Sequence, residues 1–418
     1  MREMKDSGIS WVGEIPKEWS VWRNKYIFKI TKDIVLPSEN YQLLSLTTTG
    51  IKEKDENDNG GKVPENYDGY QIVKENDLVM CLFDLDCSAV FSGLSPYNGM
   101  ISPAYKVLKV KKRIANEQYY RYWFNYVGSK RFYKQYSKSL RFTLNADEFN
   151  RLFSLLPPLA EQQRIAEFLD RACGKIDGLK ADIQAQIDTL EQYKRSVITE
   201  AVTHGLNPSA PMKDSGAGWM PLIPLHWKAD KLKFHLRQRG IKNQIDKQVL
   251  SLYREYGIVP KDSRDDNHNV TSEDVSDYRY VRVGDFVVNK MKAWQGSVAV
   301  SNYEGIVSPA YFVYEFSDDL INKRYFHYLM RNKTYATEFR RLSGGIREGQ
   351  WDLPSEALNN TIILLPPLDE QQEIADYLDN KCAEIERIIA DKKSQIETLD
   401  GYKKSLIYEY VTGKKEVG

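Results

Sequence analysis

Long apolar runs are missing from this chain of 418 residues. It has no stretch of about 18 apolar residues, so we expect no transmembrane helix. The first residues, Met1-Arg2-Glu3-Met4-Lys5-Asp6, lack the apolar core of a signal peptide. These two absences lead us to expect a cytoplasmic protein.

Cysteine is scarce as well, with four in the whole chain. Cys81 and Cys87 have neither Cys-x-x-Cys spacing nor a nearby histidine, and Cys173 and Cys382 sit at equivalent points of two long helical segments. We interpret all four as small apolar side chains in a reducing compartment, and expect neither a zinc site nor disulfides.

Motifs of catalysis are absent too. The chain has no phosphate-binding Gly-x-x-x-x-Gly-Lys-Ser/Thr loop, no Gly-x-Gly-x-x-Gly and no His-Glu-x-x-His, and its five histidines form no cluster. It also lacks the Asn/Asp-Pro-Pro-aromatic tetrapeptide of amino-methyltransferases. Asp84 and Asp86 are better interpreted as turn or surface groups than as a metal-binding pair. We expect no catalytic residue and no metal site.

The net charge of +1 hides an uneven distribution of charge. Between Tyr105 and Phe142 the only acid is Glu117, and the basic residues of that stretch are Lys106, Lys109, Lys111, Lys112, Arg113, Arg121, Lys130, Arg131, Lys134, Lys138 and Arg141. A neutral total with a basic block is compatible with a phosphate-binding face.

The most informative feature present is an internal repeat. Leu155–Gln163 (LLPPLAEQQ) returns as Leu364–Gln372 (LLPPLDEQQ), and Met4–Gly8 (MKDSG) returns as Met212–Gly216. The period is about 208 residues, far longer than the roughly 20–50 residues of a solenoid repeat. The chain is therefore a tandem duplication of a domain plus a helix, which predicts a pseudo-twofold object and a partner with two sites.

The repeat divides the chain into four segments. These are a first module at 1–158, a central helix at 159–206, a second module at 207–366 and a carboxy-terminal helix at 367–418. Short β-like runs bounded by turn residues alternate with helical runs in both modules, so we expect α+β modules in which strands dominate.

The two long segments have apolar residues at three-four spacing. The first stripe is Ile165, Leu169, Ala172, Ile176, Leu179, Ile183, Leu190 and Val197; the second is Ile374, Leu378, Ile385, Ile388, Ile396, Leu399 and Leu406, interrupted by Lys381 and Lys392. A lone helix of roughly 60 Å, at ~1.5 Å per residue, would be poorly buried. The stripes therefore predict an antiparallel coiled coil.

Basic and aromatic residues mark candidate DNA-binding segments in the first module. In Tyr119–Trp123 the aromatics are best interpreted as the core face of a helix. The following segment ends in a small-residue loop that carries an arginine. The candidate DNA-binding residues are Lys130, Arg131, Lys134, Lys138, Ser139 and Arg141.

The second module has comparable segments. Its candidates are Lys290, Lys292, Trp294, Gln295, Arg340, Arg341, Arg347 and Gln350. Arginine can bind guanine in a bidentate manner and glutamine can bind adenine, although each segment could also be an ordinary surface loop. Between matching frame elements, Gly50–Tyr70 does not align convincingly with Gly257–Asp277, which suggests two different half-targets.

One order of motifs occurs twice in the chain: Lys-Asp-Ser-Gly, Trp and Ile-Pro-x-x-Trp, then a variable domain, then Leu-Pro-Pro-Leu-x-Glu-Gln-Gln and a long helix. This order resembles that of the specificity subunit of type I restriction–modification systems. The resemblance covers essentially the whole chain; Ala217 and Gly218 depart from Ile9 and Ser10. It implies two target recognition domains, each reading one half of a split, asymmetric site in double-stranded DNA.

The resemblance also implies that the helices set the spacer between the half-sites and dock methyltransferase subunits, two in number. S-adenosylmethionine, ATP and Mg would belong to the methyltransferase and restriction subunits. Two alternatives remain at this stage: a nuclease or methyltransferase with an unfamiliar site, and a purely structural coiled-coil adaptor.

Overall fold

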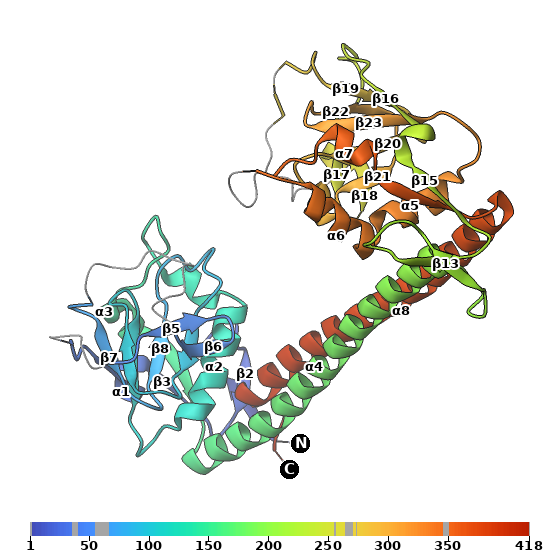
Figure 1. Cartoon of the computed structure of the whole chain (residues 1–418). Helices are drawn as coiled ribbons and strands as arrows, with labels where there is room; N and C mark the ends of the chain where they lie inside the picture. The colour runs from blue at the N-terminus through green and yellow to red at the C-terminus, as the bar shows by residue number, and fades with distance from the viewer. Residues whose placement is uncertain are drawn as a thin grey trace. The chain divides into compact units, whose positions relative to one another are not determined.

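The computed structural model describes residues 2–35, 41–54, 67–254, 256–263, 271–272, 274–345 and 351–417. The chain divides into two compact units: unit 1 is Met1–Ile183 with Ser394–Gly418, and unit 2 is Gln184–Lys393. Each unit contains one globular module and a part of both long helices (Figure 1). In the described part of the chain, no helix is both long and apolar enough to cross a membrane.

The first module and the helix that follows it contain these elements. The strands are β1 (Met4–Asp6), β2 (Glu14–Pro16), β3 (Ser20–Arg23), β4 (Phe28–Thr31), β5 (Leu44–Thr47), β6 (Gly50–Glu53), β7 (Gln71–Val73), β8 (Leu78–Met80), β9 (Ser92–Leu94), β10 (Gly99–Ile101), β11 (Lys106–Val110) and β12 (Phe153–Leu156). The helices are α1 (Asn24–Ile27), α2 (Glu117–Ser129), the 3-10 helix η1 (Phe132–Tyr136), α3 (Ala146–Arg151) and α4 (Leu159–His204).

The second module repeats this order with small changes. Its strands are β13 (Met212–Asp214), β14 (Leu222–Pro224), β15 (Lys228–Lys231), β16 (Leu236–Arg239), β17 (Leu250–Tyr253), β18 (Gly257–Pro260), β19 (Arg279–Val281), β20 (Phe286–Asn289), β21 (Val298–Val300), β22 (Gly305–Val307), β23 (Tyr311–Phe316) and β24 (Ile362–Leu365). Its helices are η2 (Leu232–Phe234), η3 (Lys261–Ser263), η4 (Ala293–Gln295), α5 (Lys323–Arg331), α6 (Lys333–Leu342), α7 (Ser355–Asn359) and α8 (Leu368–Val411).

The main sheet of each module has four antiparallel strands in the same spatial order. It is β4-β11-β8-β9 in the first module and β16-β23-β20-β21 in the second. Two-stranded ladders also correspond, for example β12 with β3 and β15 with β24. The duplication seen in the sequence is therefore a duplication of the fold.

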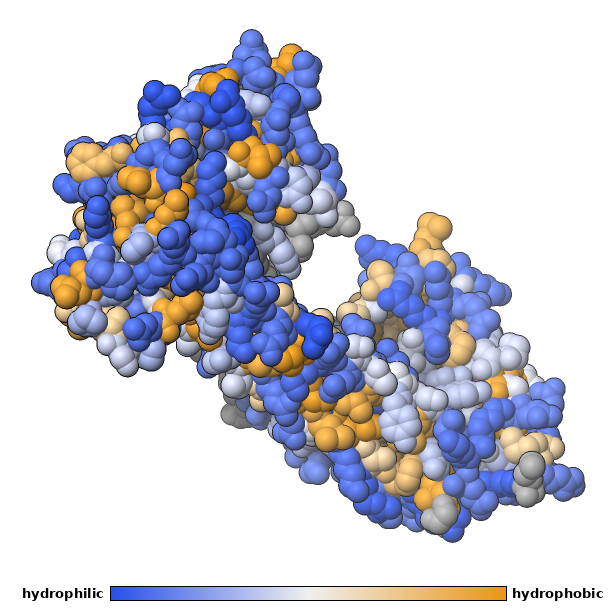
Figure 2. Space-filling model, turned by 90° about the vertical axis from the view of Figure 1, so that its right-hand side faces the viewer, coloured by the Kyte–Doolittle hydropathy of each residue, from blue (hydrophilic) through white to orange (hydrophobic). Residues whose placement is uncertain are grey.

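Helix α2 covers the first sheet with an aromatic face. Asn116 caps it by accepting a hydrogen bond from the backbone N–H of Tyr119 at 2.9 Å. Tyr119, Tyr120 and Trp123 are fully buried, so their interpretation as core residues is confirmed. The face seen in Figure 2, by contrast, is largely hydrophilic, with apolar side chains in scattered groups.

The repeated Glu of the Pro-Pro-Leu-x-Glu-Gln-Gln motif anchors each long helix to a buried tryptophan. Trp19 Nε1 donates to Glu161 Oε2 at 2.9 Å, and Trp227 Nε1 donates to Glu370 Oε1 at 3.1 Å. Both indoles are fully buried. This contact explains why the Ile-Pro-x-x-Trp segment and the helix start are repeated together.

The following Gln fastens the loop that enters the aromatic helix. The backbone N–H of Asn116 donates to Gln162 Oε1 at 2.8 Å, and that of Asn322 donates to Gln371 Oε1 at 2.8 Å. The side-chain amides donate to the carbonyls of Ile114 and Pro157 in unit 1 and of Leu320 and Pro366 in unit 2. Since buried backbone groups need partners, these glutamines are structural.

The carboxy-terminal end of the other long helix packs against the same module. In unit 1, Tyr119 Oη donates to the carbonyl of Val411 in α8 at 3.0 Å; in unit 2, Tyr325 Oη donates to that of Val202 in α4 at 3.5 Å. Each unit therefore holds the start of one long helix and the end of the other, which is an antiparallel arrangement.

The helices pair through a heptad seam that keeps most positions of the predicted stripe but has Cys173 and Lys180 in place of Ala172 and Leu179. The seam positions of α4 are Leu169, Cys173, Ile176, Lys180, Ile183, Ile187, Leu190, Lys194 and Val197; those of α8 are Leu378, Cys382, Ile385, Ile389, Lys392, Ile396, Leu399, Lys403 and Leu406. Including Leu179 in the stripe was wrong, because its side chain is 53% exposed. Lys381 also lies beside the seam, where it pairs with Glu384.

Lysines occupy seam positions because each reaches an acceptor on the opposite helix. In unit 1, Lys180 pairs with Asp400, and Lys403 with Asp177 at 2.7 Å. In unit 2, Lys194 pairs with Glu386. Their aliphatic stems cover the apolar seam while the ammonium groups stay solvated. The predicted α+β fold with two long, paired helices is confirmed.

Candidate nucleic-acid interface

In unit 1, two loops meet beyond the ends of β8 and β9. The backbone N–H groups of Asp84 and Leu85 donate to the carbonyls of Arg141 and Phe142, at 3.1 and 3.3 Å, and Leu144 N–H donates to the carbonyl of Leu82 at 2.8 Å. The main sheet therefore positions the arginine-bearing loop, which follows η1.

The predicted residues of the first module lie together on this surface. Lys130, Arg131, Lys134, Lys138 and Arg141 are all exposed, and Lys134 Nζ lies 4.5 Å from the ring centroid of Phe142. Ser139 contributes to the shape of the loop, because its Oγ accepts a hydrogen bond from the backbone N–H of Thr143 at 2.7 Å.

Arg121 was part of the basic block but faces the helix pair of its own unit. It forms an ion pair with Asp170 of α4, and Tyr122 Oη donates to the same carboxylate at 2.7 Å. Burial raises the pKa of Tyr122, which keeps its hydroxyl protonated as a donor. This arginine therefore joins α2 to α4 through a carboxylate of its own unit.

In unit 2, the loop between β20 and β21 meets the end of α6. The rings of Trp294 and Trp351 have centroids 5.6 Å apart, and the guanidinium of Arg340 lies 5.8 Å from each of them. Lys292 and Gln295 are exposed on the same loop. The structure thus brings Trp294 together with Arg340 and Trp351, which are 46 and 57 positions later in the chain, into one cationic and aromatic surface.

Two other predicted cations of unit 2 are neutralised by neighbours. Lys290 Nζ lies 3.0 Å from Asp352 Oδ2. Arg341 donates from Nε and Nη2 to the buried carboxylate of Glu338, both at 2.7 Å. Arg340 and Arg341 are adjacent in sequence but meet different neighbours, the tryptophan pair and Glu338 respectively. Arg347 and Gln350 lie outside the described residues.

Sequence reasoning missed two side chains of these surfaces. Trp351 packs on Trp294, and its only sequence signal was its place at the end of the loop. Leu140, between Ser139 and Arg141, is 102% exposed. The sequence indicated it only as an apolar residue in an otherwise polar loop. In the described ranges, no three or more His, Cys, Asp or Glu residues are grouped so as to hold a metal ion.

Comparisons with known proteins agree on one family. Residues 241–398 match the family model described as the type I restriction modification DNA specificity domain. The MjaVIII specificity subunit of a type I restriction enzyme of Methanocaldococcus jannaschii is 26% identical over an alignment of 370 residues, which covers 83% of this chain and 80% of that protein.

Two solved structures share the fold. A chain from a study of complex assembly and conformational transition of the type I R-M system aligns with a TM-score of 0.68 at 13% identity, over 96% of this chain and 99% of that chain. The HsdS subunit from Thermoanaerobacter tengcongensis aligns with a TM-score of 0.50 at 15% identity, over 96% and 98%.

Proposed function

We propose that the chain is a specificity subunit of a type I restriction–modification system, the family to which its family-model match and its relatives point, and that each of its modules reads one half of a bipartite, asymmetric DNA site. Proteins of this family are not enzymes by themselves, and the chain accordingly works with DNA and with partner methyltransferase and restriction subunits.

The observation that carries the proposal is that the two modules present different chemistry at the same place in the fold. Beyond β8 and β9, the first module exposes Arg131 and Arg141 beside Asp84 and Asp86; beyond β20 and β21, the second exposes Lys292 and Arg340 with a tryptophan pair. Cations neutralise phosphates, whereas arginine, glutamine and carboxylate groups distinguish base edges. One scaffold with two different surfaces favours two different half-sites.

The test is the methylated motif of a host that carries this chain and its partner subunits. Arg141→Ala should relax the sequence of one half-site, and Trp294→Ala should relax the other, with about 1–3 kcal/mol of discrimination lost for a direct base contact. Both variants relaxing the same half would contradict the proposal.

The long helices carry a second repeated feature, an exposed stripe. In unit 2, α4 exposes Gln186, Thr189, Tyr193 and Ser196; in unit 1, α8 exposes the identical Gln395, Thr398, Tyr402 and Ser405. Their three-four spacing places each set on one helix face. We call this set the repeated exposed stripe.

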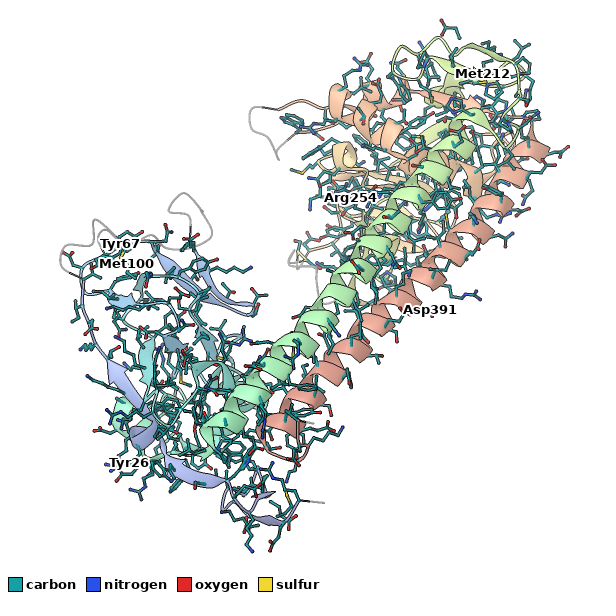
Figure 3. All side chains as sticks on the ribbon, turned by 90° about the horizontal axis from the view of Figure 1, so that it is seen from below. Tyr26, Tyr67, Met100, Met212, Arg254 and Asp391 are labelled. Carbon is teal, nitrogen blue, oxygen red and sulfur yellow. The ribbon has the colours of Figure 1, made fainter. Side chains whose placement is uncertain are left out.

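Folding alone does not require the stripe to be identical in both helices. Other exposed positions of the same stretch differ between the copies, such as Gln192 against Gly401 and Arg195 against Lys404. Tyr193 and Tyr402 are 49% and 57% exposed. Side chains such as Asp391 show how α8 presents its outer face to solvent (Figure 3).

We propose that each copy of the stripe docks one methyltransferase subunit, so that the chain takes two. Two identical surfaces, one in each unit, support two copies of the same partner. Exposed tyrosines are frequent energetic centres of protein interfaces. S-adenosylmethionine, ATP and Mg are then bound by the partner subunits. The restriction subunits join through the complex of this chain with its methyltransferase subunits.

Stoichiometry tests this docking. Tyr193→Ala and Tyr402→Ala should each weaken one site by about 2 kcal/mol or more, so that native mass spectrometry at limiting partner concentration finds one methyltransferase subunit per chain in place of two. The double variant should bind none. Gln192→Ala, which changes an exposed position outside the stripe, is the matched control. Retention of two subunits by the double variant would refute the assignment.

A further inference from the structure

Leu140 is more exposed than any other large apolar side chain in the described part of the chain, at 102%. Burying a leucine is worth about 1.5–3 kcal/mol, so folding gains nothing from this position. A single exposed leucine is common on protein surfaces; its surroundings are what give this one a role.

The loop that carries Leu140 is held in one shape by its own side chains. Ser137 Oγ donates to the carbonyl of Thr143 at 2.9 Å, Ser139 Oγ accepts from the Thr143 backbone N–H at 2.7 Å, and Phe142 N–H donates to the Ser139 carbonyl at 3.0 Å. These bonds close the base of the loop and leave Leu140 at its tip.

The same loop is fixed to the body of the module and stores strain. The carbonyl of Arg141 accepts from Asp84 N–H. Phe142 has φ +45°, a left-handed conformation that costs of order 1 kcal/mol in a residue other than glycine. A strained, tethered loop holds its tip in a defined position, and a loop without function has no need of this.

Basic residues outnumber acids on the segments next to the apolar tip. Lys138 and Arg141 flank it in the sequence, and Lys130, Arg131 and Lys134 are exposed on the adjoining segment. The acids on the neighbouring loop are Asp84 and Asp86. An apolar tip on a segment with several exposed cations is complementary to a polyanion with an apolar interior, and duplex DNA is such a ligand. Proteins that deform DNA insert leucine and similar side chains between base steps, at a cost of a few kcal/mol for unstacking.

We propose that Leu140 is a wedge that enters the duplex at the half-site bound by the first module and unstacks one base step, while the surrounding cations hold the flanking phosphates. The inference rests on the proposed reading of DNA by this module. It adds sequence dependence through deformation, because pyrimidine–purine steps unstack most easily.

The experiment uses the chain assembled with its methyltransferase subunits and a duplex bearing its methylated motif, with 2-aminopurine placed at successive positions of each half-site. Wild-type protein should raise the fluorescence at one step of one half-site, away from the methylated adenine. Leu140→Ala should abolish that rise and weaken binding about tenfold, a factor equivalent to 1.4 kcal/mol. Leu140→Met, which keeps a long apolar side chain, should retain the rise.

Lys138→Ala is the matched control, since losing one phosphate contact weakens binding but leaves the fluorescence pattern. An unchanged pattern in Leu140→Ala, or no rise with wild-type protein apart from the methylated adenine, would exclude the wedge. If Arg141→Ala is also without effect on binding and on the motif, the proposed recognition surface itself fails; if Arg141→Ala does have an effect, only the wedge fails.

Discussion

Trp19 Nε1 donates a hydrogen bond to Glu161 Oε2, and Trp227 makes the same bond to Glu370. Each bond joins the amino-terminal part of a module to the first turn of the long helix that leaves it. Glu161 also accepts from Arg2 at 2.8 Å, and Glu370 lies 2.7 Å from His226 Nε2. The acid of the repeated motif is therefore a structural junction, and its repetition reflects two equivalent junctions.

Replacing either indole should loosen its own unit only. Trp227→Phe removes the donor to Glu370 and part of a fully buried side chain, so we expect about 2–4 kcal/mol of destabilisation in unit 2. Hydrogen exchange measured by mass spectrometry should accelerate in peptides from β14, α5 and the start of α8. Trp19→Phe is the reciprocal control and should affect the first module and the start of α4. Equal acceleration across both units in either variant would contradict the two-junction interpretation.

The stability of unit 2 should depend on pH through His327. Burial, together with the nearby Arg331, lowers the pKa of His327 from 6.5 to about 4, and its Nδ1 accepts from the backbone N–H of Val300 at 3.3 Å. Between these two pH values the unfolded chain binds a proton that the folded chain does not. The contribution of neutral His327 to the free energy of unfolding is therefore complete above pH 6.5. It is lost as the pH falls toward 4, by roughly 1–2 kcal/mol at pH 5.

His327→Gln isolates this contribution, because a glutamine carbonyl can accept the same hydrogen bond without titrating. Urea unfolding at pH 7 and pH 5 should show a smaller loss of stability for the variant than for wild-type protein. Parallel losses in the two proteins would place the pH dependence on other groups.

The sequence was sufficient to predict two modules and two paired helices because both signals are periodic. Identical motifs reveal the duplication, and three-four spacing reveals the stripe. The phase of the seam was harder to predict. Hydrophobicity favoured Leu179 over Lys180, but Lys180 reaches Asp400 on the opposite helix and Leu179 remains exposed. Such a partner, more than 200 residues away, cannot be recognised from a local pattern.

The candidate site was predicted only in part, for a similar reason. Arg340 and Arg341 are identical residues at adjacent positions, and only the structure shows that Glu338 binds Arg341. The three-residue spacing of Glu338 and Arg341 was the available signal. Trp351 joined the site through its contact with Trp294, 57 residues earlier in the chain, and the folded loops alone create that proximity.

Lys292 and Lys290 offer a matched pair for testing the second surface. Lys292→Ala removes an exposed cation from the loop that carries Trp294 and should weaken DNA binding by the assembled complex, with a smaller salt dependence by about one phosphate contact. Lys290→Ala removes a cation already paired with Asp352 and should have much less effect. Binding constants between 50 and 200 mM salt measure the difference. Equal losses would mean that both lysines meet phosphate in the complex.

The length of the paired helices should determine the spacer between the half-sites. Lys180 and Asp400 lie opposite each other in unit 1, so a four-residue insertion after Ala181 can be matched by another after Thr398 to keep the two helices in register. Each insertion adds roughly 6 Å at ~1.5 Å per residue, close to two base pairs at about 3.4 Å each. The methylated motif should then keep both half-site sequences and gain one or two base pairs between them. Substituting four residues at the same places without insertion is the control. If a half-site sequence changes while the spacer does not, the helices do not measure the distance, and contacts elsewhere in the assembly must set it.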